Sequence, residues 1–316
     1  MFQRLKSFTK DTAPFIWKRI TKKYYIIRRS EMGAGFFSNY MWVMGHIVFA
    51  KKLGYIPVVD MENYPTFYSE KEPVNGTCNA WNYYFEDVDK VGLDEAYSSG
   101  KYILGRDKYL TKYAEKYSTS IYRYPTNRMI AYYTPVMKKN IRVKKNLLEE
   151  FETEWNLKVK RGNRVLGVHV RGTDMKVNPS HPTPPSFTEY IKVTKDLLKK
   201  HQDITHIFLA TDEDLVKELY EKEFQKSGIE LFTNRAFRAC NNGEEQRIGI
   251  HEINVEQPRP HHKYLLGLEV LRDAWFLSKC DYLVCSHSNV ANVAILWNEN
   301  QYHEIVCMES QNESSN

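Results

Sequence analysis

One apolar segment that ends in a polar cluster constrains the fold of this chain more than any other feature. The run 165–170 consists of small and branched apolar residues with a single histidine, and the polar residues that follow it include an arginine, a threonine and an aspartate. Its length is that of a strand buried on both faces, as in parallel sheets. The sequence therefore predicts an α/β fold with polar chemistry at the carboxyl end of a strand, where open α/β sheets bind ligands.

Strand alternation places His169 and Arg171 on one face, so we expect both to contact one ligand. The planar fork of an arginine matches two phosphate oxygens and keeps its charge, which suits a diphosphate. A structural ion pair between Arg171 and a carboxylate such as Asp174 is the alternative interpretation.

The peptide His169-Val-Arg-Gly-Thr-Asp174 resembles a motif of the GDP-fucose-dependent fucosyltransferase superfamily, in particular of the branch that holds the α1,6-fucosyltransferases of eukaryotes and of rhizobial nodulation. The resemblance implies two Rossmann-like domains that face each other across a cleft, a GT-B-like arrangement. We expect an N-terminal α/β domain over 1–160, with the glycine loop and the acceptor side, and a C-terminal domain over 161–316 that binds the nucleotide sugar.

Composition agrees with an ordinary globular protein, because 316 residues suffice for two cores and the net charge of +6 is too small to indicate nucleic-acid binding. Five cysteines lack metal-ligand spacing, and with no signal peptide or membrane span in the sequence we expect a cytoplasmic protein. The basic, aromatic N-terminus could contact a membrane peripherally or pack on its own protein.

The N-terminal half begins with a strand (24–28), a glycine loop, a helix (37–52) and a second strand (56–60). Gly33 and Gly35 would let the backbone approach a ligand, although most such glycine pairs are only turns. In the superfamily this loop contacts the donor's diphosphate. The aromatic-rich stretch 63–133 suits sugar rings, so we assign the acceptor to it, although each single tyrosine could equally belong to the core.

In the C-terminal half we expect helices at 144–155, 186–200, 264–278 and 290–297, and strands at 205–210, 229–232, 281–285 and 304–307. The acids in Thr211-Asp-Glu-Asp214 could form a metal motif, but their place before a helix favours capping. Glu269 and Asp273 share one face of an apolar helix. Ser286-His-Ser-Asn289, at a helix N-terminus, is typical of a second phosphate site.

The segment from Leu271 to Ser288 is similar to the third conserved block of the superfamily. The resemblance implies that Asp273 recognises guanine and that Ser288, or Asn289 if the alignment shifts by one, contacts phosphate.

The resemblance implies a glycosyltransferase of polysaccharide biosynthesis, metal-independent and without a cofactor, that transfers fucose from GDP-fucose to a glycan or lipid-linked oligosaccharide with inversion. Arg171 would stabilise charge on the leaving phosphate. Asp174 is the nearest acid for the catalytic base, which stays unassigned, because relatives carry a second arginine at Gly172 and a further acid beyond the motif. The alternatives are another nucleotide sugar as donor, or a non-catalytic nucleotide- or glycan-binding protein.

Overall fold

The structure, a computed structural model, describes residues 24–29, 34–106, 124–172, 184–240, 258–299 and 301–308. These residues form two compact units. The N-terminal unit contains the described residues of 1–34, 39–118 and 136–143, and the C-terminal unit contains those of 35–38, 119–135 and 144–316. No helix in the described ranges is both long and apolar enough to cross a bilayer.

The N-terminal unit is built on a three-stranded parallel sheet in the order β2-β1-β3. Its first strand is buried at every position, as expected for a continuous apolar run. The predicted strand, helix and strand are present, and β3 is an element that the sequence pattern did not reveal. The elements are β1 (Tyr24–Ile27), α2 (Phe36–Lys52), β2 (Ile56–Val59), η1 (Ala80–Tyr83), η2 (Val88–Lys90), α3 (Leu93–Ser98) and β3 (Tyr102–Leu104).

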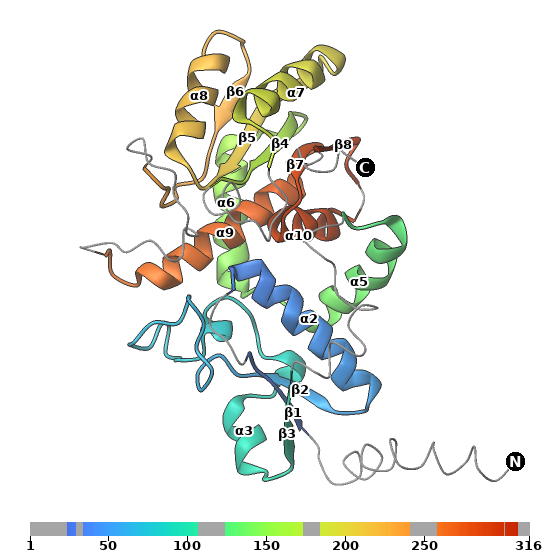
Figure 1. Cartoon of the computed structure of the whole chain (residues 1–316), viewed down its shortest axis with the longest axis vertical. Helices are drawn as coiled ribbons and strands as arrows, with labels where there is room; N and C mark the ends of the chain where they lie inside the picture. Colours follow the sequence, from blue (N-terminus) through green and yellow to red (C-terminus); the bar gives the residue numbers. More distant parts are fainter. Residues whose placement is uncertain are drawn as a thin grey trace, which may run out of the picture. The chain divides into compact units, whose positions relative to one another are not determined.

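The C-terminal unit contains a five-stranded parallel sheet in the order β6-β5-β4-β7-β8, with helices α7 and α8 following β4 and β5 (Figure 1). The predicted key strand, β4, lies at the centre and is buried over 165–170. Helix α5 (Asn127–Asn140) belongs to this unit up to Pro135 and to the N-terminal unit from Val136. The other elements are α6 (Lys145–Lys158), β4 (Arg164–Val170), α7 (Phe187–Lys200), β5 (Ile204–Thr211), α8 (Asp214–Phe224), β6 (Glu230–Phe232), α9 (His262–Lys279), β7 (Tyr282–Ser286), α10 (Asn289–Asn298) and β8 (Glu304–Met308).

Helix α9 is the central helix of this unit, because it packs against α10, β4 and β5. Its apolar side chains account for the unbroken hydrophobic pattern that the sequence shows. Helix α7 begins with the expected capping box, in which Ser186 Oγ accepts from the Glu189 amide and the Glu189 carboxylate accepts from the Ser186 amide.

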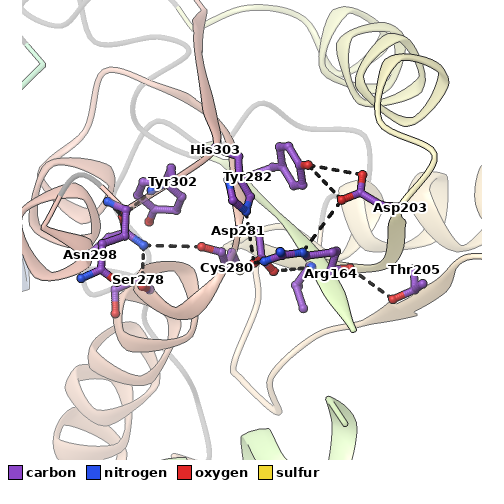
Figure 2. Close-up of polar contacts among 12 residues, drawn as sticks. Arg164, Asp203, Thr205, Ser278, Cys280, Asp281, Tyr282, Asn298, Tyr302 and His303 are labelled. Atoms are coloured by element: carbon purple, nitrogen blue, oxygen red, sulfur yellow. Dashed lines mark hydrogen bonds and ion pairs between the residues drawn. The ribbon is translucent and has the colours of Figure 1, made fainter. Parts of the chain in front are cut away.

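Polar contacts fix the amino ends of β4 and β7 (Figure 2). Arg164 Nη1 donates to Asp281 Oδ1 over 2.5 Å, and the Val165 amide donates to Asp281 Oδ2 over 2.9 Å. Asn298 Nδ2 donates to the carbonyl of Ser278 over 2.9 Å, which ties the end of α10 to the end of α9. These contacts hold the sheet at the edge opposite to the polar cluster, so the carboxyl ends of β4 and β5 are left for other chemistry.

Candidate functional site

An open cavity lies at the carboxyl ends of β4 and β5, where the polar cluster was predicted. Strands, the loop after β6 and helices α9 and α10 all contribute to its wall. The lining residues are His169, Val170, Arg171, Thr211, Asp212, Ala236, Phe237, Leu266, Glu269, Val270, Asp273 and Val290. The cavity thus brings together three residues predicted for donor binding, His169, Arg171 and Asp273, from two distant parts of the sequence.

Arg171 forms an ion pair with Asp212, whose other carboxylate oxygen accepts from the Gly172 amide over 2.9 Å. Both side chains are mostly buried, with exposed fractions of 21% and 12%. Asp212 therefore fixes the guanidinium plane against the cavity wall. The capping role that we expected for Asp212 is wrong, because α8 begins after Glu213 and has no side-chain cap. Asp174, the partner suggested by the sequence, lies outside the described residues.

Glu213 occupies the space that a side chain at position 172 would need. A Cβ on Gly172 would lie 2.0 Å from Glu213 Oε1 and 2.4 Å from Cδ. Glu213 is 1% exposed, so its carboxylate cannot simply swing into solvent. Glycine at this position is a steric requirement of the packing here. The second arginine of the resembling enzymes could enter only if Glu213 left its place.

His169 is 4% exposed, and burial together with the nearby charge of Arg171 lowers its pKa to about 4. The imidazole is therefore neutral at physiological pH and can both donate and accept one hydrogen bond. Its Nδ1 lies 3.4 Å from Ser288 Oγ, which also caps α10 by accepting from the Ala291 amide over 3.0 Å. The structure thus links two residues that the sequence placed in separate phosphate sites.

Asp273 lies on the cavity wall and accepts a hydrogen bond from Asn234 Nδ2 over 2.8 Å. Burial raises the pKa of Asp273 to about 7, against the opposing effects of the Asn234 hydrogen bond and the positive charge of Arg238. Its carboxyl group is consequently half protonated near neutral pH. A ligand that donates hydrogen bonds to it would favour the ionised form.

The loop after β6 is fastened to α9 through Glu269, which is 7% exposed. Glu269 accepts from both terminal nitrogens of Arg259, over 2.6 and 2.8 Å, and from the Phe237 amide over 3.1 Å. Arg238 closes the loop on itself by donating to the Asn234 carbonyl over 2.7 Å. The sequence, which shows little periodicity over 234–262, indicated a long functional loop or insertion there but gave Asn234 no specific role.

Two further predicted site residues that the structure describes, Gly35 and Asn289, do not line the cavity. The side-chain oxygen of Asn289 is buried and accepts no hydrogen bond within the described part of the chain. At Gly35 an added Cβ would meet nothing within 4 Å, so packing does not require glycine there. Gly33, the other predicted loop glycine, is outside the described residues, as is the basic N-terminal segment over 1–23 for which membrane contact was considered.

Comparison with solved structures finds several fucosyltransferases at low sequence identity. A NodZ α1,6-fucosyltransferase co-crystallised with GDP matches with 13% identity and a TM-score of 0.53, over 86% of this chain and 91% of that chain. NodZ from Bradyrhizobium matches with 14% identity and a TM-score of 0.51, over 86% and 92%. POFUT1 in complex with GDP matches with 11% identity and a TM-score of 0.53, over 90% and 98%. The fold is that of these fucosyltransferases.

This fucosyltransferase fold agrees with the resemblance that the short motifs indicated, and it extends over most of the chain and not only the motif regions. No protein-family model matches the sequence, and no curated protein sequence matches it either. The fucosyltransferase fold is thus visible in the backbone, although sequence similarity has fallen to the level of isolated peptides.

Proposed function

We propose that this protein is an inverting, metal-independent glycosyltransferase that transfers a sugar, with fucose from GDP-fucose as the first candidate, to a glycan or lipid-linked oligosaccharide. The observation that carries the proposal is the convergence of Arg171 and Asp273 on one cavity in a fucosyltransferase fold. Solved structures with the same fold are complexes with GDP. We further propose a GT-B arrangement, with a donor domain over 161–316 and an acceptor domain over 1–160.

In this proposal Asp273 accepts from the two N–H donors on the guanine edge, an interaction that uracil cannot copy. Arg171 contacts the diphosphate and stabilises the negative charge that grows on the departing β-phosphate. Asp212 acts through Arg171, because it holds the guanidinium in a fixed plane before the donor arrives. Neutral His169 and the Ser288 hydroxyl supply uncharged hydrogen bonds beside it.

The acceptor hydroxyl attacks the anomeric carbon from the face opposite to the leaving phosphate, and its proton passes to a carboxylate base. Asp174 is the proposed base by its place in the motif. Gly33 and Gly35 are proposed to contact the diphosphate from the acceptor domain, and Asn289 to contact phosphate where Ser288 does not.

A donor screen tests the proposal. Purified protein is incubated with GDP-fucose, GDP-mannose, UDP-glucose and UDP-N-acetylglucosamine, each with a library of oligosaccharides, and products are read by mass spectrometry with and without chelator. We expect a mass gain of one deoxyhexose from GDP-fucose, undiminished by chelator. Transfer from a different donor would replace fucose as the substrate. GDP binding without turnover of any donor would indicate a nucleotide-binding protein without transferase activity.

A second candidate function is transfer from a nucleotide sugar other than GDP-fucose, and the position of the Glu213 carboxylate favours it. It lies against Gly172, where the resembling enzymes carry a positive side chain, so the local charge beside the donor site differs from theirs. A GDP-linked sugar other than fucose would retain the guanine contact at Asp273 while using this altered surrounding.

A further inference from the structure

The carboxyl edge of the N-terminal sheet is rich in arginine. Because the strand order is β2-β1-β3, residues that follow β1 lie next to those that follow β3. Arg28 and Arg29 follow β1, and Gly105 and Arg106 follow β3. This edge, like its counterpart in the C-terminal unit, is where parallel α/β sheets bind ligands.

Arg28 is held in place without a carboxylate partner. Its Nε donates to the Gly105 carbonyl over 3.3 Å, and its guanidinium lies 4.5 Å from the centre of the Tyr64 ring. Within the described residues its two terminal nitrogens donate to nothing. These nitrogens form the fork that binds carboxylate or phosphate with two parallel hydrogen bonds.

The nearby acid of the same edge, Asp60 after β2, is already occupied. Its two oxygens accept from the Tyr97 hydroxyl over 2.5 Å, from the amides of Glu62 and Asn63 over 3.1 and 2.8 Å, and from Asn63 Nδ2 over 3.0 Å. With four donors on a fully buried carboxylate, Asp60 organises its own turn, and among the described residues it forms no ion pair with Arg28.

Two further guanidinium groups belong to this edge. Arg106 is exposed and forms no ion pair within the described ranges. Arg29 donates to Asn39 Oδ1 over 2.9 Å and lies 5.0 Å from the Trp42 ring centre. Each of the two stacked arginines therefore rests on an aromatic ring, which orients a guanidinium without removing its charge.

We propose that Arg28 and Arg106 bind an acidic group on the sugar acceptor, so that the acceptor is a glycan carrying a carboxylate or a phosphate. That the bound anion belongs to a sugar acceptor rests on the proposed transferase function. The anion site itself is inferred from the contacts described above. A preorganised arginine whose fork has no partner in the described ranges is matched by a planar or tetrahedral anion. A neutral glycan would leave that charge uncompensated.

Direct binding tests the site with defined probes. Methyl glucuronide, methyl glucoside 6-phosphate and neutral methyl glucoside are titrated into the full chain, and binding is followed by saturation-transfer NMR. We expect both acidic probes to bind at least tenfold more tightly than the neutral one, with the difference shrinking at high salt. The preferred acidic probe tells whether the natural group is a carboxylate or a phosphate.

Variants locate the binding. Arg106→Gln should weaken the acidic probes several-fold, since Arg106 is exposed and its loss leaves the fold intact. Arg28→Gln should weaken them about tenfold. Lys101→Gln is the matched control, because it removes one positive charge from the opposite end of β3, and it should change nothing. GDP affinity, measured in parallel, should be unchanged in all three variants.

Two results separate the inference from the proposed function. If GDP binds but acidic and neutral probes bind alike, or if Arg28→Gln and Arg106→Gln behave like Lys101→Gln, the anion site is wrong and the transferase proposal stands. If acidic probes bind as expected while GDP does not bind at all, the anion site stands and the nucleotide-sugar proposal fails.

Discussion

Arg171 is the residue on which the proposed chemistry depends, and its ion pair with Asp212 defines what a substitution should do. Lysine keeps a charge but cannot serve Asp212 and a phosphate with one rigid plane. A sequence can show that an arginine ends a strand. It could not show this pair, because Asp212 ends a neighbouring strand and lies 41 residues away in the chain.

We predict that Arg171→Lys lowers turnover by about 10²–10³, comparable to loss of one oxyanion-hole donor, while GDP still binds. Asp212→Asn should lower turnover less, because the amide still accepts from the Gly172 amide but no longer holds a guanidinium by charge. Steady-state kinetics and thermal melting of each variant provide the measurements. An Arg171→Lys protein that turns over normally would remove Arg171 from the mechanism.

The protonation of Asp273 predicts how GDP affinity depends on pH. Its raised pKa, about 7, means that the free protein must release a proton from this carboxyl before guanine can donate to it. GDP affinity should therefore fall as the pH drops from 8 to 6. The proton held by Asp273 contributes at most tenfold per pH unit below its pKa.

The phosphates of GDP also titrate in this range, so Asp273→Asn is needed as the reference. The variant keeps the phosphate contribution and lacks the carboxyl, and its affinity for GDP should depend less on pH than that of the natural protein. Isothermal titration at three pH values decides the matter. Parallel pH profiles for the two proteins would mean that Asp273 does not recognise the base.

At the scale of elements, the loop after β6 depends on helix α9 for its shape. Glu269 accepts from both the Phe237 amide and the Arg259 fork, and Asp273 of the same helix accepts from Asn234, so two acids of α9 hold this loop. We predict that Glu269→Ala raises hydrogen exchange over 234–240 and lowers stability by about 1–3 kcal/mol, the cost of leaving buried donors unpaired.

Two controls accompany this prediction. Arg259→Gln retains the contact between Glu269 and the Phe237 amide, so its exchange over 234–240 should rise less. Glu221→Ala removes an exposed acid of α8 that pairs with Lys217, and the stability of this variant should stay within about 0.5 kcal/mol of that of the natural protein. Equal exchange in Glu269→Ala and the natural protein would show that the loop holds its shape without Glu269.

The elements themselves were predictable to different degrees. Strands β4, β5 and β7 and helices α7, α9 and α10 follow from apolar runs of the right length, since deep burial leaves a strong pattern. Strand β3 has only three residues and is half-buried throughout, so its pattern is weak. Helix α5 was missed because Pro135 lies inside it, and proline normally argues against a helix interior.

On the scale of the whole molecule, the two compact units offer a test of where the donor binds. If the C-terminal unit alone recognises GDP, the ligand should raise the melting temperature of one calorimetric transition and leave the other in place. At a GDP concentration 100 times the Kd the expected stabilisation is about 2.7 kcal/mol. UDP at the same concentration serves as the control and should shift neither transition.

One transition that moves as a whole would indicate that both units contribute to donor binding or unfold together. No shift with GDP would contradict the assignment of a guanine nucleotide. The sequence suggested a single boundary near residue 160, whereas the structure divides the chain several times. Which unit a segment belongs to depends on its contacts with segments distant in the sequence, and the local amino-acid composition does not reveal those contacts.

The central position of β4 also has a consequence for synthesis on the ribosome. Its two neighbours, β5 and β7, are both made later, and β7 begins only at Tyr282. During translation the central strand of the sheet therefore emerges with neither partner, and one of its hydrogen-bonding edges stays open until nearly the whole chain has left the exit tunnel. Exposed edges of this kind promote aggregation. We expect the nascent chain to depend on chaperones over this interval, and slower elongation between β5 and β7 to reduce the soluble yield.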